Sequence, residues 1–458
     1  MQQNKHIQHL YSRAGFGLSP QEWQQKKDWT RQQALNELFD LPTSLPKLAI
    51  LTPKPMQTKM MDNVARNEMR KEQKKIIARQ NIAWMERMAN PQENALLEKM
   101  SLFWHGHFAC ENKIAYLVAQ QLDSIRQHAL GNFRNLVIAI AKDPAMIRYL
   151  NNQQNRKNQP NENFARELLE LFTIGRGNYT EKDIKEAARA FTGWSSDKTG
   201  TFLFRQRQHD EGQKTFFGKT GNFNGEDIID MILAKRETAV FITKKIYCYF
   251  VNDQINERRV QQLATDFYDS KYDIKQLMYT IFSSDWFYKT ENIGTKIKSP
   301  IELMAGLMRQ LNIVNSNPKS LLFLQKSLGQ VLYNPPNVAG WPGGKNWIDN
   351  STLLLRLNLA RAIFQVSDMP FTGKNYPEEV NFRRMRKLAL TLNLQPIFKI
   401  TATMNNVEAL KELTDYLLIA PLTIDEKDLL SFMKTSNQTD FVKMLCVRLM
   451  SLPEYQMC

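Results

Sequence analysis

Residues 103–108 carry two of the six histidines in the chain, His105 and His107. Neutral imidazole is a common ligand of zinc, copper, iron and nickel, so this pair is a candidate metal site. Side chains two positions apart on a regular helix point about 200° from each other, and both reach one ion only if the helix breaks, which Gly106 can supply. The alternative is a hydrogen-bonded core residue, because His107 shares a helical stripe with apolar neighbours.

Residues 161–175 predict a two-faced helix. Asn163, Arg166, Glu167 and Glu170 fall on one narrow face at 100° per residue, and apolar side chains cover the other. A carboxylate beside an arginine can act as a general base with its orienting partner. We therefore assign Glu167 as a candidate general base and Arg166 as a group that binds an anion. The alternative is a set of solvated or salt-bridged charges.

His209 and Asp210 stand in a turn between two predicted strands, with Lys214 close behind. On a loop, an imidazole and a carboxylate can complete a mixed site with side chains from neighbouring helices. The expectation is that His209 joins His105 and His107 as a metal ligand and that Asp210 is catalytic. The alternative is that Asp210 only makes the turn. Nothing here has the fixed spacing of H-E-x-x-H.

Residues 333–347 are rich in proline and glycine and contain Trp341 and Trp347. Such a loop holds irregular backbone in shape and can line a cleft for a sugar ring or flat ligand. The alternative is a rigid plug that packs Trp341 into the core. Four residues are candidates for substrate binding: Trp341, Trp194, Arg13 and Lys214.

These residues must be positioned mainly by helices, because apolar residues recur at helical spacing through most of the chain. The expected fold is mainly α, with one small β-hairpin at 201–217 and an irregular loop at 333–350. Helices are expected to begin at Ser19-Pro20 and at Thr180, and a long polar helix is expected over 56–88. Residues 1–366 form the expected core, and 367–458 a helical extension packed on it.

The 458 residues include 61 Lys+Arg and 46 Asp+Glu, a formal net charge of +15. This excess favours an acidic small molecule, polymer or protein as partner. The polar helix is basic but has only Trp84 among aromatics, which argues against nucleic acid. The four cysteines lie far apart, without a disulfide or thiolate-zinc pattern. Residues 1–18 lack the apolar run of a secretory signal and no stretch has the length of a transmembrane segment, so a cytoplasmic location is expected.

Six ordered segments resemble one bacterial family, domain of unknown function 1800. They are the segment 9–17 (HLYSRAGFG), FWHGHF, NENFARELLELFTIG, AARAFTGW, the His209-Asp210 turn and PPNVAGWP. The resemblance covers residues 9 to at least 362 and implies a shared fold without implying an activity. Many members of this family look exported and are encoded near sulfatase-like proteins, whereas this chain shows no signal peptide.

Two functions follow from the sequence. The first is a metal-dependent, hydrolase-like enzyme acting on an acidic or sugar-containing substrate through a His/Glu/Asp site with a divalent ion. The second is a non-catalytic binding or assembly protein with an acidic protein partner. In that case the same motifs are structural clamps.

Overall fold

The structure, a computed structural model, describes residues 2–47, 62–197, 199–316, 318–364, 390–431, 433 and 437–458. Across these ranges the chain is mainly helical with a few short strands, which confirms the predicted fold class. The α-helices from the N-terminus to the middle of the chain are α1 (Gln2–Ala14), α2 (Pro20–Lys26), α3 (Arg31–Leu38), α4 (Asn63–Ala89), α5 (Ala95–His107), α6 (Ala115–His128), α7 (Phe133–Ala141), α8 (Pro144–Tyr149), α9 (Asn163–Glu167), α10 (Glu181–Ala190) and α11 (Gly225–Leu233). The remaining α-helices are α12 (Arg236–Phe250), α13 (Glu257–Asp269), α14 (Ile274–Ser283), α15 (Pro300–Gln310), α16 (Pro318–Leu328), α17 (Asn350–Ile363), α19 (Gln395–Thr401), α20 (Asn406–Leu417), α21 (Glu426–Ser431) and α22 (Gln438–Met450).

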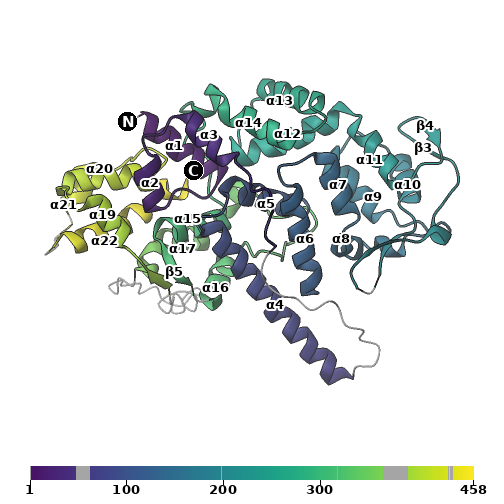
Figure 1. The fold of residues 1–458 in the computed structure, drawn as a ribbon, viewed down its shortest axis with the longest axis horizontal. Coiled ribbons are helices and arrows are strands. Elements are labelled where there is room, and N and C mark those ends of the chain that lie inside the picture. Colours follow the sequence, from purple (N-terminus) through teal and green to yellow (C-terminus); the bar gives the residue numbers. More distant parts are fainter. Residues whose placement is uncertain are drawn as a thin grey trace.

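The helices form an elongated body (Figure 1). Helices α19–α22 lie at one end, beside α1 and α2, and α10 lies near the other end. The first half of α4 projects away from the body, and its residues are largely exposed. The predicted helix over 56–88 corresponds to α4, although 56–61 lies outside the described residues.

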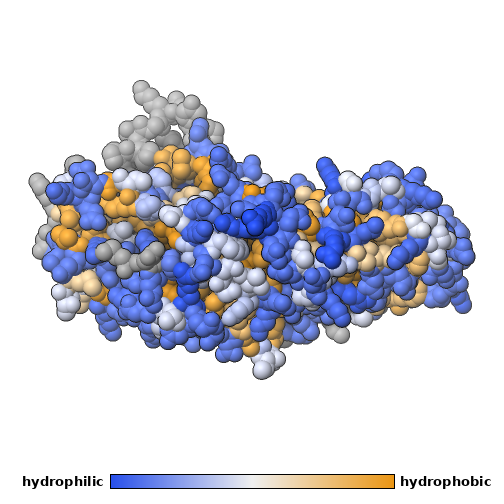
Figure 2. Space-filling model, turned by 90° about the horizontal axis from the view of Figure 1, so that it is seen from above, coloured by the Kyte–Doolittle hydropathy of each residue, from blue (hydrophilic) through white to orange (hydrophobic). Residues whose placement is uncertain are grey.

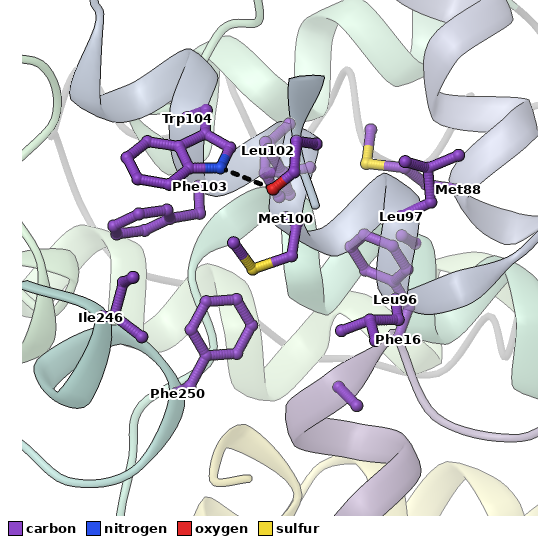
Figure 3. Close-up of a cluster of buried hydrophobic side chains, with 14 of the residues drawn as sticks. Phe16, Met88, Leu96, Leu97, Met100, Leu102, Phe103, Trp104, Ile246 and Phe250 are labelled. Atoms are coloured by element: carbon purple, nitrogen blue, oxygen red, sulfur yellow. Dashed lines mark hydrogen bonds between the residues drawn. The ribbon is translucent and has the colours of Figure 1, made fainter. Parts of the chain in front are cut away.

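The core is centred on α5, whose side chains are almost all buried. Figure 3 shows Met100, Phe103 and Trp104 of this helix facing Ile246 and Phe250 of α12. The indole Nε1 of Trp104 donates a hydrogen bond to the Ala129 carbonyl at 2.9 Å, so its one polar atom is satisfied inside the core. Because α5 carries His105 and His107, both histidines are placed by this packing.

Local helix signals in the sequence are confirmed by the caps. The Ser19 side chain accepts a hydrogen bond from the Glu22 amide, and Glu22 bonds back to the Ser19 amide, which completes a capping box at α2. Thr180 and Asp183 form the same motif at α10. The predicted helix over 161–175 begins as α9 but continues as a π-helix, η2 (Leu168–Thr173), so its side chains depart from regular 100° spacing.

The β structure consists of short antiparallel pairs, but the strands pair differently from the expected single hairpin. Strand β2 (Phe202–Phe204) pairs with β1 (Trp194–Ser196). Strand β3 (Lys214–Phe216) pairs with β4 (Lys219–Gly221). The segment 205–213 therefore joins two hairpins, and its 3-10 helix η3 (Gln206–Gln208) leads directly to His209. A third pair joins β5 (Ile313–Ser316) and β6 (Leu390–Leu392).

The C-terminal helices pack on the rest of the chain. Helix α19 contacts α2, and α22 contacts α17. After α22 the chain continues through η6 (Pro453–Gln456), and an antiparallel bridge pairs Ile297 with Met457. Residues 367–389 of the predicted extension lie outside the described ranges. None of the described helices is both long and apolar enough to cross a membrane.

Candidate functional site

His105 and His107 are both buried and both hydrogen-bonded within the core. The Nε2 atom of His105 accepts a hydrogen bond from the Tyr333 amide at 3.1 Å. The Nε2 atom of His107 lies 3.0 Å from the Phe172 carbonyl, which can only accept, so this nitrogen carries its proton. Each histidine thus uses its Nε2 atom to tie α5 to a distant segment. This is the core alternative that the stripe around His107 suggested.

The burial of these histidines predicts acid lability. Burial lowers the pKa of His105 to about 4, and burial together with the charge of Lys245 lowers the pKa of His107 to about 3, from an ordinary value of 6.5. The unfolded chain therefore binds more protons than the folded one below pH 6.5. Stability present above that pH is lost as the pH falls toward 4, by up to about 3 kcal/mol per histidine.

Asp143 has the opposite effect on the pH dependence of stability, because burial raises the pKa of its carboxyl group to about 7. The test therefore compares two proteins, the natural chain and His107→Gln. For each, urea unfolding measures how much the free energy of unfolding changes between pH 7 and pH 4. We expect the natural chain to lose more stability on acidification than the variant. Parallel losses for the two proteins would show that His107 titrates normally.

Glu167 and Arg166 lie on α9, whereas His105 and His107 lie on α5. Two Arg166 nitrogens each lie 2.8 Å from an oxygen of Glu181, and a second ion pair joins Arg166 to Glu162 at 3.1 Å. Arg166 is thereby neutralised by two carboxylates, as the salt-bridge alternative expected. Burial and the charge of Glu170 raise the pKa of the half-buried Glu167. Both residues remain predictions as catalytic groups.

The loop after Tyr333 packs tightly on the end of α5. Gly340 has φ +80°, and a Cβ atom there would lie 2.2 Å from the Gly106 carbonyl oxygen. This contact brings the ring of the partly buried Trp341 to 5.5 Å from the ring of His105. Trp194 is buried and packs at 5.1 Å against Phe191. The two tryptophans therefore serve packing in this structure, and their predicted roles in substrate binding are untested.

Asp210 and Lys214 hold the junction between the two hairpins. The Asp210 carboxylate accepts hydrogen bonds from Arg189 Nε at 2.7 Å and Arg189 Nη2 at 3.2 Å. Burial alone would raise the pKa of Asp210, but the bonds from Arg189 and the Gly212 amide outweigh it and lower that pKa. The buried Lys214 donates to the Gly212 carbonyl at 3.0 Å and to Asn222 Oδ1 at 3.2 Å. Both side chains shape this loop.

A surface pocket of about 530 Å³ opens beside this junction, within the range of roughly 300–1,000 Å³ of many ligand sites. His209 and Asp210 line it together with six other polar residues or glycine, namely Lys157, Asn158, Gln206, Arg207, Glu211 and Gly212. The His209 Nδ1 atom lies 2.9 Å from the Thr192 carbonyl and must carry the proton. In the neutral imidazole Nε2 therefore bears the lone pair, and this atom has no hydrogen-bond partner among the described residues.

The candidate residues thus divide among separate places. His209 and Asp210 share the surface pocket, with Lys214 beneath it, while Arg13 is buried on α1 and donates a hydrogen bond to the Asn292 carbonyl. Among the described ranges of the chain, no three or more histidine, cysteine or acidic side chains are placed to bind a metal ion. The metal site expected from His105, His107 and His209 is therefore not formed here, because the Nε2 atoms of the first two are already engaged in the core.

Sequence reasoning missed two cationic residues of the pocket. Arg207 precedes His209 by two positions, inside the predicted hairpin over 201–217. Lys157 lies in the polar segment between η1 (Asn152–Gln154) and α9, and its amide donates to the Gln208 carbonyl at 2.9 Å. The one available signal was the lysine and arginine content of two loops, and it does not reveal that the loops meet.

The fold and the pocket define a mainly helical protein with a polar, open site at the junction of two short hairpins. The chain belongs to the family described as a protein of unknown function (DUF1800), whose model matches residues 9–457. The match confirms the resemblance and extends through α19–α22, beyond residue 366. Comparisons with curated proteins and with solved structures found no match.

Proposed function

We propose that this protein binds an acidic, sugar-containing molecule in the pocket beside His209. The observation that carries the proposal is the free lone pair on His209 Nε2, held in a fixed tautomer at a pocket of suitable size. Lys157 and Arg207 supply two positive charges at the rim, and both are exposed. A guanidinium and an ammonium group suit a carboxylate or sulfate, and the neighbouring amides suit hydroxyl groups.

The same site supports hydrolysis as the reaction class. A neutral imidazole with one nitrogen fixed by a carbonyl can take a proton from water through the other nitrogen while the water oxygen bonds to the anomeric carbon, and it can return that proton to the leaving oxygen as the glycosidic bond breaks. His209 would carry out this step, and Asp210, clamped by Arg189, would hold the loop that presents it. This proposal keeps the substrate class expected from the sequence and requires no metal ion at His209.

Binding of glucuronic acid oligosaccharides, followed by ligand-observed NMR, tests the proposal, with neutral glucose oligosaccharides as matched ligands. We expect Arg207→Gln and Lys157→Gln each to weaken binding by about three- to tenfold, since each removes one charge contact. Arg205→Gln is the control, because this exposed arginine on the same segment does not line the pocket. His209→Asn should abolish any release of new reducing ends.

Equal binding of acidic and neutral sugars, or equal losses with Arg205→Gln, would contradict the proposal. The alternative from the sequence, a non-catalytic protein that docks an acidic protein partner, would use the exposed half of α4 seen projecting in Figure 1. Failure of every sugar together with binding of polyglutamate would favour that alternative. The face shown in Figure 2 is mostly hydrophilic with scattered apolar patches, as expected for a polar ligand or partner.

A further inference from the structure

An exposed aromatic ring stands at the edge of the pocket beside His209. Phe204 ends strand β2 and is 40% exposed, unlike most large apolar side chains of the described residues, which are buried. The centroid of its ring lies 5.2 Å from that of the His209 ring, and the two ring planes are inclined by 66°. Phe204 therefore packs directly against a residue that lines the pocket.

The contact with His209 leaves much of the Phe204 ring accessible. An edge-on contact between two rings covers at most one face of either ring. Among the described residues, the Phe204 ring has no second aromatic or cationic neighbour within stacking distance. A flat apolar surface is consequently open to solvent next to a polar pocket. Burial of that surface against a ligand is favourable because it removes apolar area from water.

The backbone of Phe204 adds hydrogen-bonding groups beside this ring. The Arg205 amide donates to the Gly193 carbonyl at 2.8 Å, and bonded and non-bonded pairs alternate along antiparallel strands. Phe204, paired with Trp194, is therefore at a non-bonded position, and its N–H and C=O groups point away from β1. Within the described residues this sheet has only the strands β1 and β2, so no further strand pairs with that edge.

A flat apolar face beside backbone donors and acceptors matches a pyranose ring. In the gluco configuration the hydroxyl groups lie around the edge of the ring, and its two faces carry C–H groups. One such face packs on an aromatic ring while the hydroxyl groups reach neighbouring polar groups. A peptide strand fits this edge less well, because β2 has three residues and such short edge strands resist pairing.

We propose that Phe204 is the stacking platform for a pyranose ring of the ligand, so that the protein recognises the closed ring as well as its acidic group. This inference rests on the proposed function, because the ligand is the same molecule. The sequence favoured Trp194 among the residues for substrate binding, but Trp194 is only 4% exposed. Phe204, its partner across the two strands, holds the accessible position.

Binding of glucuronic acid oligosaccharides to the full chain, followed by ligand-observed NMR, tests the platform. We expect Phe204→Ala to weaken binding by about tenfold, because it removes an aromatic anchor. Phe204→Trp should retain the affinity, since it keeps a flat ring, whereas Phe204→Leu should not. Leu203→Ala is the matched control. Leu203 is 41% exposed on the same strand, but successive side chains of a strand point to opposite faces.

A second readout is the shift of the sugar protons on binding. An aromatic ring current moves protons that lie over its face upfield. The C–H protons of one pyranose face should therefore shift upfield with the natural chain and lose this shift with Phe204→Ala. Gulonate, the open-chain reduction product of glucuronate, keeps the carboxylate and the hydroxyl groups but has no ring. It should bind the natural chain no better than it binds Phe204→Ala.

The outcomes distinguish the platform from the proposed function. Unchanged sugar binding in Phe204→Ala, together with weaker binding in Arg207→Gln, would refute the platform alone. Failure of every sugar to bind would refute both. Equal losses in Leu203→Ala and Phe204→Ala would also overturn the platform. A dimer that dissociates in both of these variants would assign the strand to contacts between two copies of the chain instead.

Discussion

Replacing Glu98 with glutamine will destabilise the folded protein by about 3–5 kcal/mol, because it leaves a buried guanidinium without its counter-charge. Glu98 Oε1 accepts hydrogen bonds from Arg126 Nε at 3.0 Å and from Arg126 Nη2 at 2.7 Å. Its other oxygen accepts one from Trp84 Nε1 at 2.9 Å. The side chains of Glu98 and Arg126 are only 1% and 2% exposed, so water cannot replace the lost carboxylate.

Urea unfolding monitored by circular dichroism measures this effect. Glu226→Gln is the matched control, since Glu226 pairs with Lys142 where both side chains are at least one-third exposed. Such a pair contributes at most about 1 kcal/mol. A double variant, Glu98→Met with Arg126→Met, should recover part of the loss, because it removes both charges together. A Glu98→Gln protein as stable as Glu226→Gln would mean that Arg126 does not depend on this carboxylate.

Replacing Gly340 with alanine will destabilise the protein by about 2–5 kcal/mol, through two separate costs. The residue has φ +80°, a conformation that L side chains rarely adopt. In addition, the new Cβ atom would lie 2.2 Å from the Gly106 carbonyl oxygen, so the loop and the end of α5 must move apart. That movement would separate Trp341 from His105 and open the core around the histidine.

The Gly177→Ala variant separates the cost of the backbone conformation from the cost of the steric contact. Gly177 has φ +86°, but a Cβ atom there meets nothing within 4 Å. We expect this control to lose only about 1–2 kcal/mol, the cost of the backbone conformation. Calorimetric unfolding of both variants gives the comparison, and the difference between them measures the steric contact. Equal losses would show that the loop after Tyr333 yields without cost, which contradicts tight packing on α5.

The helices were predictable because their signals are local. Capping boxes form between residues three positions apart, Ser19 with Glu22 and Thr180 with Asp183. Both partners of each box are therefore close together in the sequence. Gly175, the last residue of the predicted helix over 161–175, has φ +79°, a helix end that glycine favours. The apolar stripe through His107 likewise indicated a core residue. Such features depend on hydrogen bonds and periodicity over a few positions.

The strand partners were not predictable in this way. The β-like character of residues 202–204 was recognised, but it does not say whether the partner precedes or follows. The chain pairs them with 194–196, where Gly193 at φ +78° lets the Arg205 carbonyl approach closely. This contact lies at the start of the segment that carries His209 and lines the pocket. A strand shows its own pattern in the sequence, whereas pairing is set by the packing of both strands on the helices.

The amino-acid sequence alone therefore determines the helical class, the family and the caps, because these depend on local patterns and short-range bonds. An acidic ligand is a prediction from the net charge. Tertiary packing decides which polar side chains meet. Folding brings Lys157 beside His209, and it brings Arg13 near Glu302, across 289 positions of the chain, while it locks His105 and His107 in the core. The physical reason is that burying apolar surface from many helices sets these distances together, so no single segment encodes them.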